Sequence, residues 1–240
     1  MNIALVLSGG TGTRLGADIP KQYLKVNDRT ILSYCLERLF LHTLVDAVQI
    51  VADMAWQQDI LEEMKKLKLD ETGKFHGFSA PGKTRQLSIL NGLEDCLSYA
   101  SAADQVLIHD AARPCLSDVM ISGCFAGLEE SEGVLPVLPM KDTVYYSREG
   151  NTIDSLLDRS QIYAGQAPEA FKLGVYYEAN RALLPEKILK INGSTEPAIM
   201  AGMKVAMIPG DEGNFKITTK TDLERFEQIV TQKHTVNNPA

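Results

Sequence analysis

A glycine-rich stretch near the N-terminus, LVLSGGTGTRLG at residues 5–16, contains the residue types of a phosphate-binding loop. An apolar run ends in Ser8, Gly9 and Gly10, Arg14 lies inside the loop, and Lys21 follows it. Backbone N–H groups of such loops can surround phosphate oxygens. Arginine adds a planar fork of donors and lysine a compact charge, which together suit a crowded phosphoryl transition state. The stretch therefore predicts phosphoryl chemistry, with solvated loop charges as the simpler alternative.

Two common phosphate-binding motifs do not fit this loop. A Walker loop needs Lys-Ser or Lys-Thr directly after its last glycine, and Leu-Gly16-Ala provides neither. A dinucleotide fingerprint would use Gly10, Gly12 and Gly16, but one residue too many precedes the last glycine. The acidic residue expected to end the next strand is also missing from its usual place, because Asp53 lies much farther on. A third kind of phosphate site remains.

A second polar cluster, HDAARP, follows an apolar strand-like run. Asp110 closes that run, and a carboxylate at a strand end is well placed for Mg²⁺, which binds one or two carboxylates together with substrate phosphates. The alternative is an aspartate that caps the next turn. His109 precedes Asp110, and side chains alternate along a strand, so we expect His109 to point away as a packed, hydrogen-bonded histidine rather than a base.

The elements that must position these residues alternate along the chain. Apolar runs rather than strict alternations mark the strands, which indicates a mostly parallel sheet covered on both faces, a doubly wound α/β fold. Ligands bind such sheets beyond the carboxyl ends of the strands, where the polar clusters lie. Predicted strands occupy residues 2–10, 46–53, 104–114 and 133–144, and predicted helices occupy residues 30–42, 57–67, 85–97 and 119–130.

One segment, residues 142–171, departs from this alternation. Two short β-like runs flank SREGN, which is good turn material, so we predict a hairpin that projects from the sheet. An isolated two-stranded hairpin is marginal in water, and packing on a second subunit would stabilise it. With no flexible linker in sight, we predict one domain over residues 1–240 with a β-arm at about 141–165.

Composition narrows the class of protein. The chain has 240 residues, 45% hydrophobic and 23% charged, which is ordinary for a globular domain with a sizeable core. Its net charge of −7 argues against a nonspecific nucleic-acid or anionic-membrane binder. The four cysteines form no CxxC pair, so a zinc or redox site is not expected. No secretory signal is visible, and we expect reduced thiols in a cytoplasmic protein.

Six motifs in register carry a resemblance to a known family. SGGTGTRLG…PKQYL, APGKTRQLSILNGL, IHDAARPC, MKDTV, DRSQIYAGQAPEAF and GNFKITTKTDLE occur in the order seen in the cytidylyltransferases of isoprenoid and polyol-phosphate metabolism. The chain resembles the group that contains 2-C-methyl-D-erythritol 4-phosphate and ribitol-5-phosphate cytidylyltransferases. The resemblance implies a Rossmann-like nucleotidyltransferase sheet and a homodimer formed through the β-arm. It also implies a reaction of CTP with a polyol phosphate that releases pyrophosphate.

The resemblance also implies roles for individual residues. Arg14, Lys21 and Lys216 would be the catalytic cations, and Asp110 would bind nucleotide and Mg²⁺. Thr143 and Arg159 would grip the acceptor, from the same subunit or its neighbour. The remaining nucleotide-binding candidates, acting largely through backbone groups, are Ser8, Gly9, Gly10, Gly12, Gly82 and Ser88. Taken alone, Thr143 would be an ordinary strand residue, Arg159 a surface ion-pair partner and Lys216 a sheet-edge charge.

The acceptor remains open at this point. HDAARPC has the erythritol-type spelling, whereas the Gly-Gln of YAGQAPEAF resembles ribitol-type members. Ala167, Glu169, Lys83 and the Thr195-Glu196-Pro197 run depart from the erythritol type. We favour methylerythritol phosphate narrowly over ribitol phosphate. A transferase that activates a sugar 1-phosphate with another nucleotide would also fit these residues, as would a non-catalytic nucleotide-binding protein.

Overall fold

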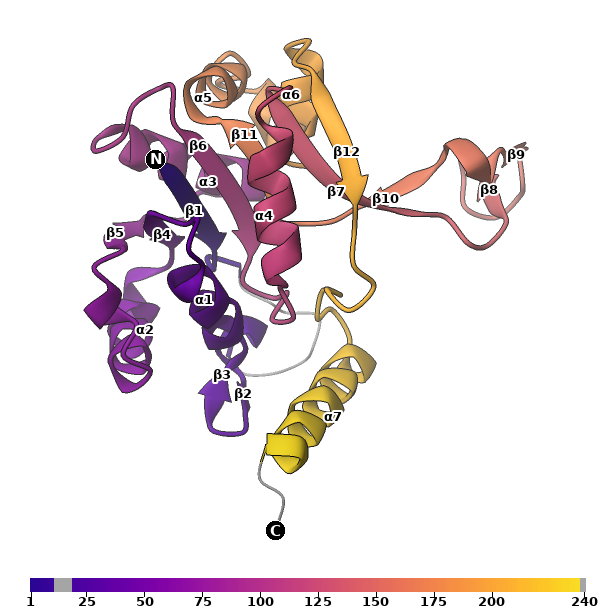
Figure 1. Cartoon of the computed structure of the whole chain (residues 1–240). Helices are drawn as coiled ribbons and strands as arrows, with labels where there is room; N and C mark the ends of the chain where they lie inside the picture. The colour runs from indigo at the N-terminus through magenta and orange to yellow at the C-terminus, as the bar shows by residue number, and fades with distance from the viewer. Residues whose placement is uncertain (11–18, 238–240) are drawn as a thin grey trace.

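The computed structural model describes residues 1–10 and 19–237, with side chains to residue 232. One eight-stranded sheet runs through the body in the order β10-β7-β11-β6-β1-β4-β5, and β12 pairs with β7 (Figure 1). At its centre β1 (Asn2–Leu7) lies parallel between β4 (Ala47–Val51) and β6 (Gln105–Asp110). Leu7 pairs with both Val51 and Asp110, so the carboxyl ends of three strands meet at one edge. The predicted mostly parallel sheet is confirmed.

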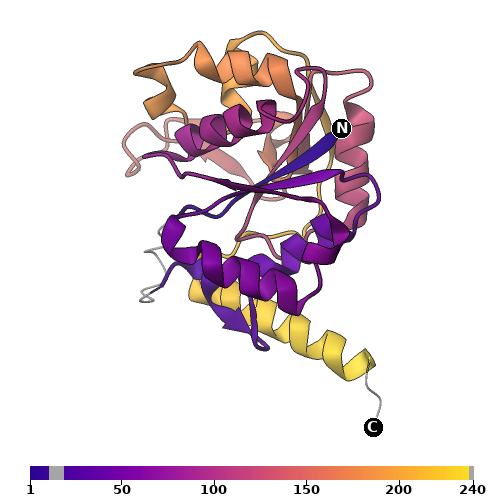
Figure 2. The same ribbon diagram turned by 90° about the vertical axis from the view of Figure 1, so that its left-hand side faces the viewer.

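Helices cover both faces of this sheet, as the doubly wound pattern predicts (Figure 2). On β1, Ala4 and Val6 face one core while Ile3 and Leu5 face the other, and all four are fully buried. The first core packs against α1 (Ile31–Leu41), α2 (Met54–Lys66) and α4 (Asp118–Gly127). The second packs against α3 (Arg85–Leu97), α5 (Leu173–Arg181) and α6 (Glu196–Met200).

Capping side chains fix where the predicted helices begin. Thr30 accepts a hydrogen bond from Ser33 N at the start of α1, and Thr84 accepts one from Leu87 N at the start of α3. Asp53 accepts from Ala55 N, so α2 begins at Met54, three residues before the predicted start. The prediction misses the strand β5 (Phe75–Ser79), which pairs parallel with β4.

The other half of the sheet is mixed rather than parallel. β7 (Gly133–Pro139) is shorter than the predicted strand, and β11 (Glu169–Lys172) runs antiparallel between it and β6. β12 (Val205–Pro209) pairs parallel with β7 at the sheet edge. Neither β11 nor β12 was predicted, because each is a short run without a clear pattern.

The arm projects away from the sheet (Figure 1). Its hairpin joins β8 (Val144–Tyr146) and β9 (Ser155–Leu157) antiparallel around the SREGN turn, as predicted. A 3₁₀ turn at Arg159–Gln161 follows. β10 (Tyr163–Gly165) returns to pair with β7 in the main sheet, so these three residues, placed in the arm by prediction, form its base instead.

The C-terminal helix α7 (Lys220–Asn237) packs on a smaller core at the N-terminal half of the chain. Phe226 and Val230 of α7 belong to a cluster with Val26 and Ile217. Val26 lies on the short hairpin that joins β2 (Lys25–Val26) to β3 (Arg29–Thr30). The four cysteines are unbridged, as expected. Among the described helices, none is long and apolar enough to cross a membrane, and the cytoplasmic location stays a prediction.

Candidate active site

A cavity of about 500 Å³ opens at the carboxyl ends of β1 and β6, where the sequence predicts a ligand. Its walls come from the loops that follow β1, β5 and β6, and from the segment that follows β12. The lining residues include Gly9, Gly10, Lys21, Gly82, Arg85, Ser88, Asp110 and Lys216.

Two glycines allow the loops around the cavity to pack closely. A Cβ atom on Gly9 would lie 2.5 Å from Cβ of Pro81, so the loop after β1 could not approach the loop after β5 with a larger residue. A Cβ atom on Gly82 would lie 2.7 Å from the backbone carbonyl carbon of Leu87. Both distances are shorter than a van der Waals contact. Glycine is therefore required at both positions for the chain to pack this closely.

The loop after β5 is fixed onto the start of α3. Gly82 N donates to the hydroxyl of Ser88 at 2.9 Å, and that hydroxyl donates to the carbonyl of Thr84 at 3.1 Å. The N-terminus of α3 is thereby placed at the cavity wall, where the helix dipole favours an anion.

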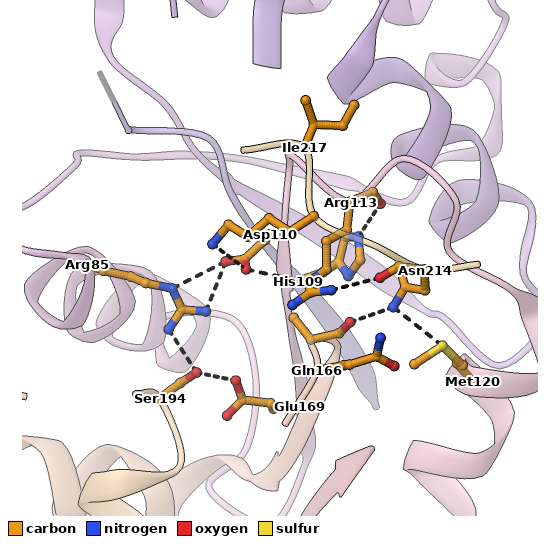
Figure 3. A network of polar contacts seen from close by, with 12 residues as sticks. Arg85, His109, Asp110, Arg113, Met120, Gln166, Glu169, Ser194, Asn214 and Ile217 are labelled. Atoms are coloured by element: carbon orange, nitrogen blue, oxygen red, sulfur yellow. Dashed lines mark hydrogen bonds and ion pairs between the residues drawn. The ribbon is translucent and has the colours of Figure 1, made fainter. Parts of the chain in front are cut away.

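Asp110 is the centre of a cluster of cations (Figure 3). Arg85 donates Nε and Nη2 to Oδ1 at 3.2 and 3.0 Å, while Lys216 Nζ lies 2.9 Å from Oδ2. Arg113 Nε lies 3.8 Å from Oδ2. Burial alone would raise the pKa of Asp110, but Arg85 and Lys216 outweigh it and hold the pKa well below its ordinary value. The carboxylate is ionised, and it gathers positive side chains around the cavity.

Lys21 reaches the same cavity from a 3₁₀ turn, η2 (Lys21–Tyr23). Its Nζ donates to the carbonyl of Ile217 at 2.6 Å, which ties the turn to the segment after β12. Gln22 donates to the carbonyls of Ser8 and Gly10, both at 2.7 Å. The hydroxyl of Ser8 donates to Tyr23 Oη at 2.9 Å, so Ser8 braces this turn from behind and does not line the cavity.

The segment after β12 carries Lys216, and backbone and side-chain bonds hold it in place. Gln166 exchanges two hydrogen bonds with Asp211, at 3.0 and 2.9 Å. Asn214 donates to the carbonyl of Ala167 at 2.7 Å, and Arg113 donates to the carbonyl of Asn214 at 2.7 Å. Residues 166–167 and Arg113 therefore position the segment that carries Lys216, which does not lie at a sheet edge.

His109 is fully buried on the strand that carries Asp110. Burial lowers its pKa to about 4, so the ring is neutral at pH 7. Nε2 lies 3.0 Å from the carbonyl oxygen of Arg113, but Nδ1 has no partner among the described residues. The expected packed histidine is observed, although only one of its ring nitrogens is hydrogen-bonded. The hydrogen bond between Nε2 and the carbonyl of Arg113 supports the turn after β6.

The predicted site residues fall into three groups. Lys21, Lys216, Gly9, Gly10, Gly82, Ser88 and Asp110 line the cavity, and Ser8 lies behind it. Gly12 and Arg14 lie outside the described residues. Thr143 and Arg159 lie on the exposed arm and line no part of this cavity. Arg159 donates to the carbonyl of Lys141 at 2.6 Å and so pairs with neither Asp154 nor Asp158.

Arg85 and Arg113 were not predicted, although both lie in motifs that carry the family resemblance. Arg85 is the first residue of α3 and was interpreted only as the start of a helix. Arg113 follows Asp110 by three residues, a spacing that one turn folds back onto the same carboxylate. The signal available in the sequence was the number of basic residues in motifs that end at the same sheet edge.

The chemistry of the donor set fits a magnesium ion only if it arrives with phosphate ligands. Among the side chains that the structure describes, no three His, Cys, Asp or Glu residues form a metal-binding group. Asp110 is a single carboxylate at the cavity wall, and Mg²⁺ commonly binds one carboxylate plus the phosphates of a substrate.

The sequence profile of the 2-C-methyl-D-erythritol 4-phosphate cytidylyltransferase family matches residues 2–232. The chain belongs to this cytidylyltransferase family. It is 34% identical over 236 residues to 2-C-methyl-D-erythritol 4-phosphate cytidylyltransferase from Neorickettsia sennetsu, covering 96% of this chain and 97% of that one. It is 30% identical over 235 residues to ribitol-5-phosphate cytidylyltransferase from Lactiplantibacillus plantarum, covering 97% of this chain and all of that one.

Members of the cytidylyltransferase family also occur as parts of longer chains. A bifunctional enzyme, IspD/IspF, from Granulibacter bethesdensis is 36% identical over 231 residues; the match covers 95% of this chain but 56% of that protein. Among solved structures, 2-C-methyl-D-erythritol 4-phosphate cytidylyltransferase from Francisella tularensis matches with a TM-score of 0.76 at 25% identity, covering 95% of this chain and 98% of that one. The predicted family, fold class and nucleotidyltransferase enzyme class are thus confirmed.

Proposed function

We propose that the protein transfers the cytidylyl group of CTP to a polyol phosphate and releases pyrophosphate. The observation that carries this proposal is the convergence of Lys21, Lys216 and Arg85 on one cavity walled by glycine loops, where Lys216 and Arg85 also pair with Asp110. Several fixed cations beside a glycine-lined wall suit a triphosphate better than a neutral ligand.

The reaction needs charge neutralisation more than acid–base chemistry. The phosphate of the acceptor is anionic at neutral pH and attacks the α-phosphorus of CTP in line, so no side chain has to remove a proton. Lys21 and Lys216 lower the energy of the transition state by neutralising charge on the phosphate oxygens, and Arg14 joins them in this proposal. His109 is fully buried and does not line the cavity, which leaves it no part in proton transfer.

Magnesium enters the proposal with the triphosphate. When bound, it would neutralise phosphate charge, with Asp110 as its protein ligand. Gly9, Gly10, Gly12, Gly82 and Ser88 would hold the nucleotide, largely through backbone groups.

The favoured acceptor is 2-C-methyl-D-erythritol 4-phosphate, in agreement with the family's description. A ribitol phosphate acceptor is the second candidate, because a relative of that name aligns with nearly the whole of this chain. Thr143 and Arg159 would bind the acceptor. Since both lie on the arm, away from the cavity lining, we propose that they act in the neighbouring subunit of a homodimer.

Several exposed apolar residues of the arm support the homodimer. Tyr145 and Leu156 are 55% and 65% exposed on the hairpin, and Ile153 is 67% exposed at its turn. Apolar side chains gathered on a projecting hairpin suit contact with a second protein surface.

One experiment tests the reaction and its specificity together. Pyrophosphate release is measured with CTP, UTP, ATP and GTP, each with methylerythritol phosphate and with ribitol 5-phosphate. We expect CTP with methylerythritol phosphate to give the highest kcat/KM. Faster turnover with another nucleotide would overturn the cytidylyl assignment, and faster turnover with ribitol phosphate would exchange the two acceptors.

A further inference from the structure

Arg85 has carboxylates on two sides, and the second of them is Glu169. Its Nε and Nη2 donate to Asp110, while Nη1 donates to the hydroxyl of Ser194 at 2.8 Å. The hydroxyl of Ser194 donates in turn to Oε1 of Glu169, and Thr195 donates to Oε2 at 2.6 Å. Figure 3 shows Ser194 standing between the guanidinium and Glu169.

The direction of these bonds is fixed by the groups involved. A guanidinium can only donate, so the oxygen of Ser194 accepts from Arg85 and the proton of Ser194 points to Glu169. The hydroxyl therefore connects the two charged groups in one orientation, and hydrogen bonds in such a chain strengthen one another.

Glu169 is 8% exposed, on β11 opposite Ile108 and so close to the end of β6. Burial raises the pKa of Glu169 above its ordinary value, and Arg85 and the hydroxyls of Ser194 and Thr195 offset this only in part. A buried carboxylate is costly unless it is paired and hydrogen-bonded. Nothing in the proposed reaction uses Glu169, so its burial beside Arg85 requires another explanation.

Arg85 still has donors available for a ligand. A guanidinium carries five N–H groups, and three of them have partners among the described residues. The side chain is 33% exposed and lines the cavity. Asp110 is also shared with Lys216 and Arg113, so it holds Arg85 in competition with two other cations. The bond through Ser194 fixes the opposite end of the guanidinium.

We infer that Glu169 is a positioning residue for the nucleotide: acting through Ser194, it holds Arg85 at the cavity wall, where the remaining N–H groups bind phosphate. This inference rests on the proposed function. Without Glu169 or Ser194, Arg85 would lose its second anchor and turn fully onto Asp110, which would also weaken the contact of Asp110 with Lys216.

The test measures binding of CTP and of inorganic tripolyphosphate by calorimetry. Ser194→Ala and Glu169→Ala should each weaken the binding of both ligands about tenfold, the effect of losing one charge-assisted hydrogen bond. Both substitutions break the same chain of contacts. The double variant should therefore lose no more affinity than the more impaired of the two single variants. The KM of the acceptor should stay within about twofold, and Ser194→Thr, which keeps the hydroxyl, should restore most of the affinity.

Controls separate this role from simple loss of stability. Ser131→Ala removes an equally buried serine hydroxyl before β7, far from the carboxyl ends of the strands, and should leave both affinities unchanged. Glu169→Gln keeps nearly the same volume but loses the carboxylate; should Glu169→Ala not fold, we expect this variant to weaken binding of both ligands and to show the same coupling with Ser194→Ala.

Three results would overturn the inference: unchanged affinities, losses that multiply in the double variant, or an acceptor KM that rises as much as the CTP dissociation constant. A wild-type protein that binds tripolyphosphate through this chain of contacts but transfers no cytidylyl group would instead refute the proposed function.

Discussion

In the cleft, Asp110 is held by cationic side chains from α3, from the turn after β6 and from the segment after β12, whereas in the arm Arg159 donates to a carbonyl of the arm itself. The side chain of Asp110 is 12% exposed, but that of Leu156 in the arm lies largely in solvent. The cleft is therefore organised within one chain, while the arm lacks a surface to pack against. Changes in the cleft should act on the transfer step, and changes in the arm on acceptor binding and on assembly.

The largest expected effect comes from removing a cleft cation. Lys216→Met should lower kcat by about 10² to 10³, the cost of losing one preorganised group that stabilises the transition state. The fold should persist, because the side chain is 37% exposed. Pyrophosphate release and circular dichroism measure the two quantities. Lys220→Met, at an exposed lysine nearby, is the control, and a loss below about tenfold in Lys216→Met would contradict a catalytic role.

The close approach of the cleft loops gives the next effect. Gly82→Ala places a Cβ atom 2.4 Å from Cβ of Leu87, so the loop must move away from α3. A displacement of about 1 Å at a catalytic site can cost about 100-fold in kcat/KM, and we expect that size here. Gly123→Ala is the control, because its Cβ atom would meet only the end of Ile208, at 3.3 Å. Equal activity of the two variants would show that the loop position does not matter.

The arm gives a smaller effect with a distinctive signature. Arg159→Ala should lower kcat/KM for the acceptor about 30-fold, as expected for one charge-assisted contact. If the arm acts across a dimer, mixing Arg159→Ala with Lys216→Met subunits restores one complete site in each mixed dimer, so about a quarter of the wild-type activity returns. Mixed samples without recovery would place Arg159 and the cleft in the same subunit.

The smallest effect concerns assembly alone. If the arm forms the proposed dimer interface, Leu156→Asp should weaken the dimer about tenfold or more, because burying one leucine contributes about 1.5 to 3 kcal/mol. The free energy of unfolding of the monomer should change by less than about 0.5 kcal/mol, since Leu156 is exposed within one chain. Sedimentation measures dimer dissociation, and denaturant titration measures the free energy of unfolding. Leu41→Asp, at a leucine of similar exposure on α1, should leave the dimer intact; equal weakening by both would contradict an interface at the arm.

The parallel half of the fold was predictable because its signals are local. Its apolar strands end in polar residues. Thr30 and Thr84 each cap a helix through an N–H only three residues farther along the chain. β5 was missed since Gly77, at φ +135°, and a register shift beside Gln49 interrupt an already short pattern. β11 forms a strand between β6 and β7, and β12 forms one beside β7, and no local pattern records those neighbours.

The site was predictable to the extent that its residues end predicted strands or begin predicted helices. Asp110 closes an apolar strand, and this position alone pointed to the cleft. Glu169 gives no such signal, because a single glutamate in QAPEAF is typical of a surface residue until β11 places it opposite β6. The function of Arg85 likewise depends on Ser194, 109 residues away.

The bond between Lys21 and the carbonyl of Ile217 joins residues 196 positions apart. During synthesis the N-terminal part of the chain leaves the ribosome first, and its strands can begin to pair before the rest exists. A nascent chain that ends before Lys216 has neither that lysine nor the Ile217 carbonyl that accepts from Lys21. The centre is thus assembled only after residue 217 has been translated, and shorter products lack it even where their central strands have formed.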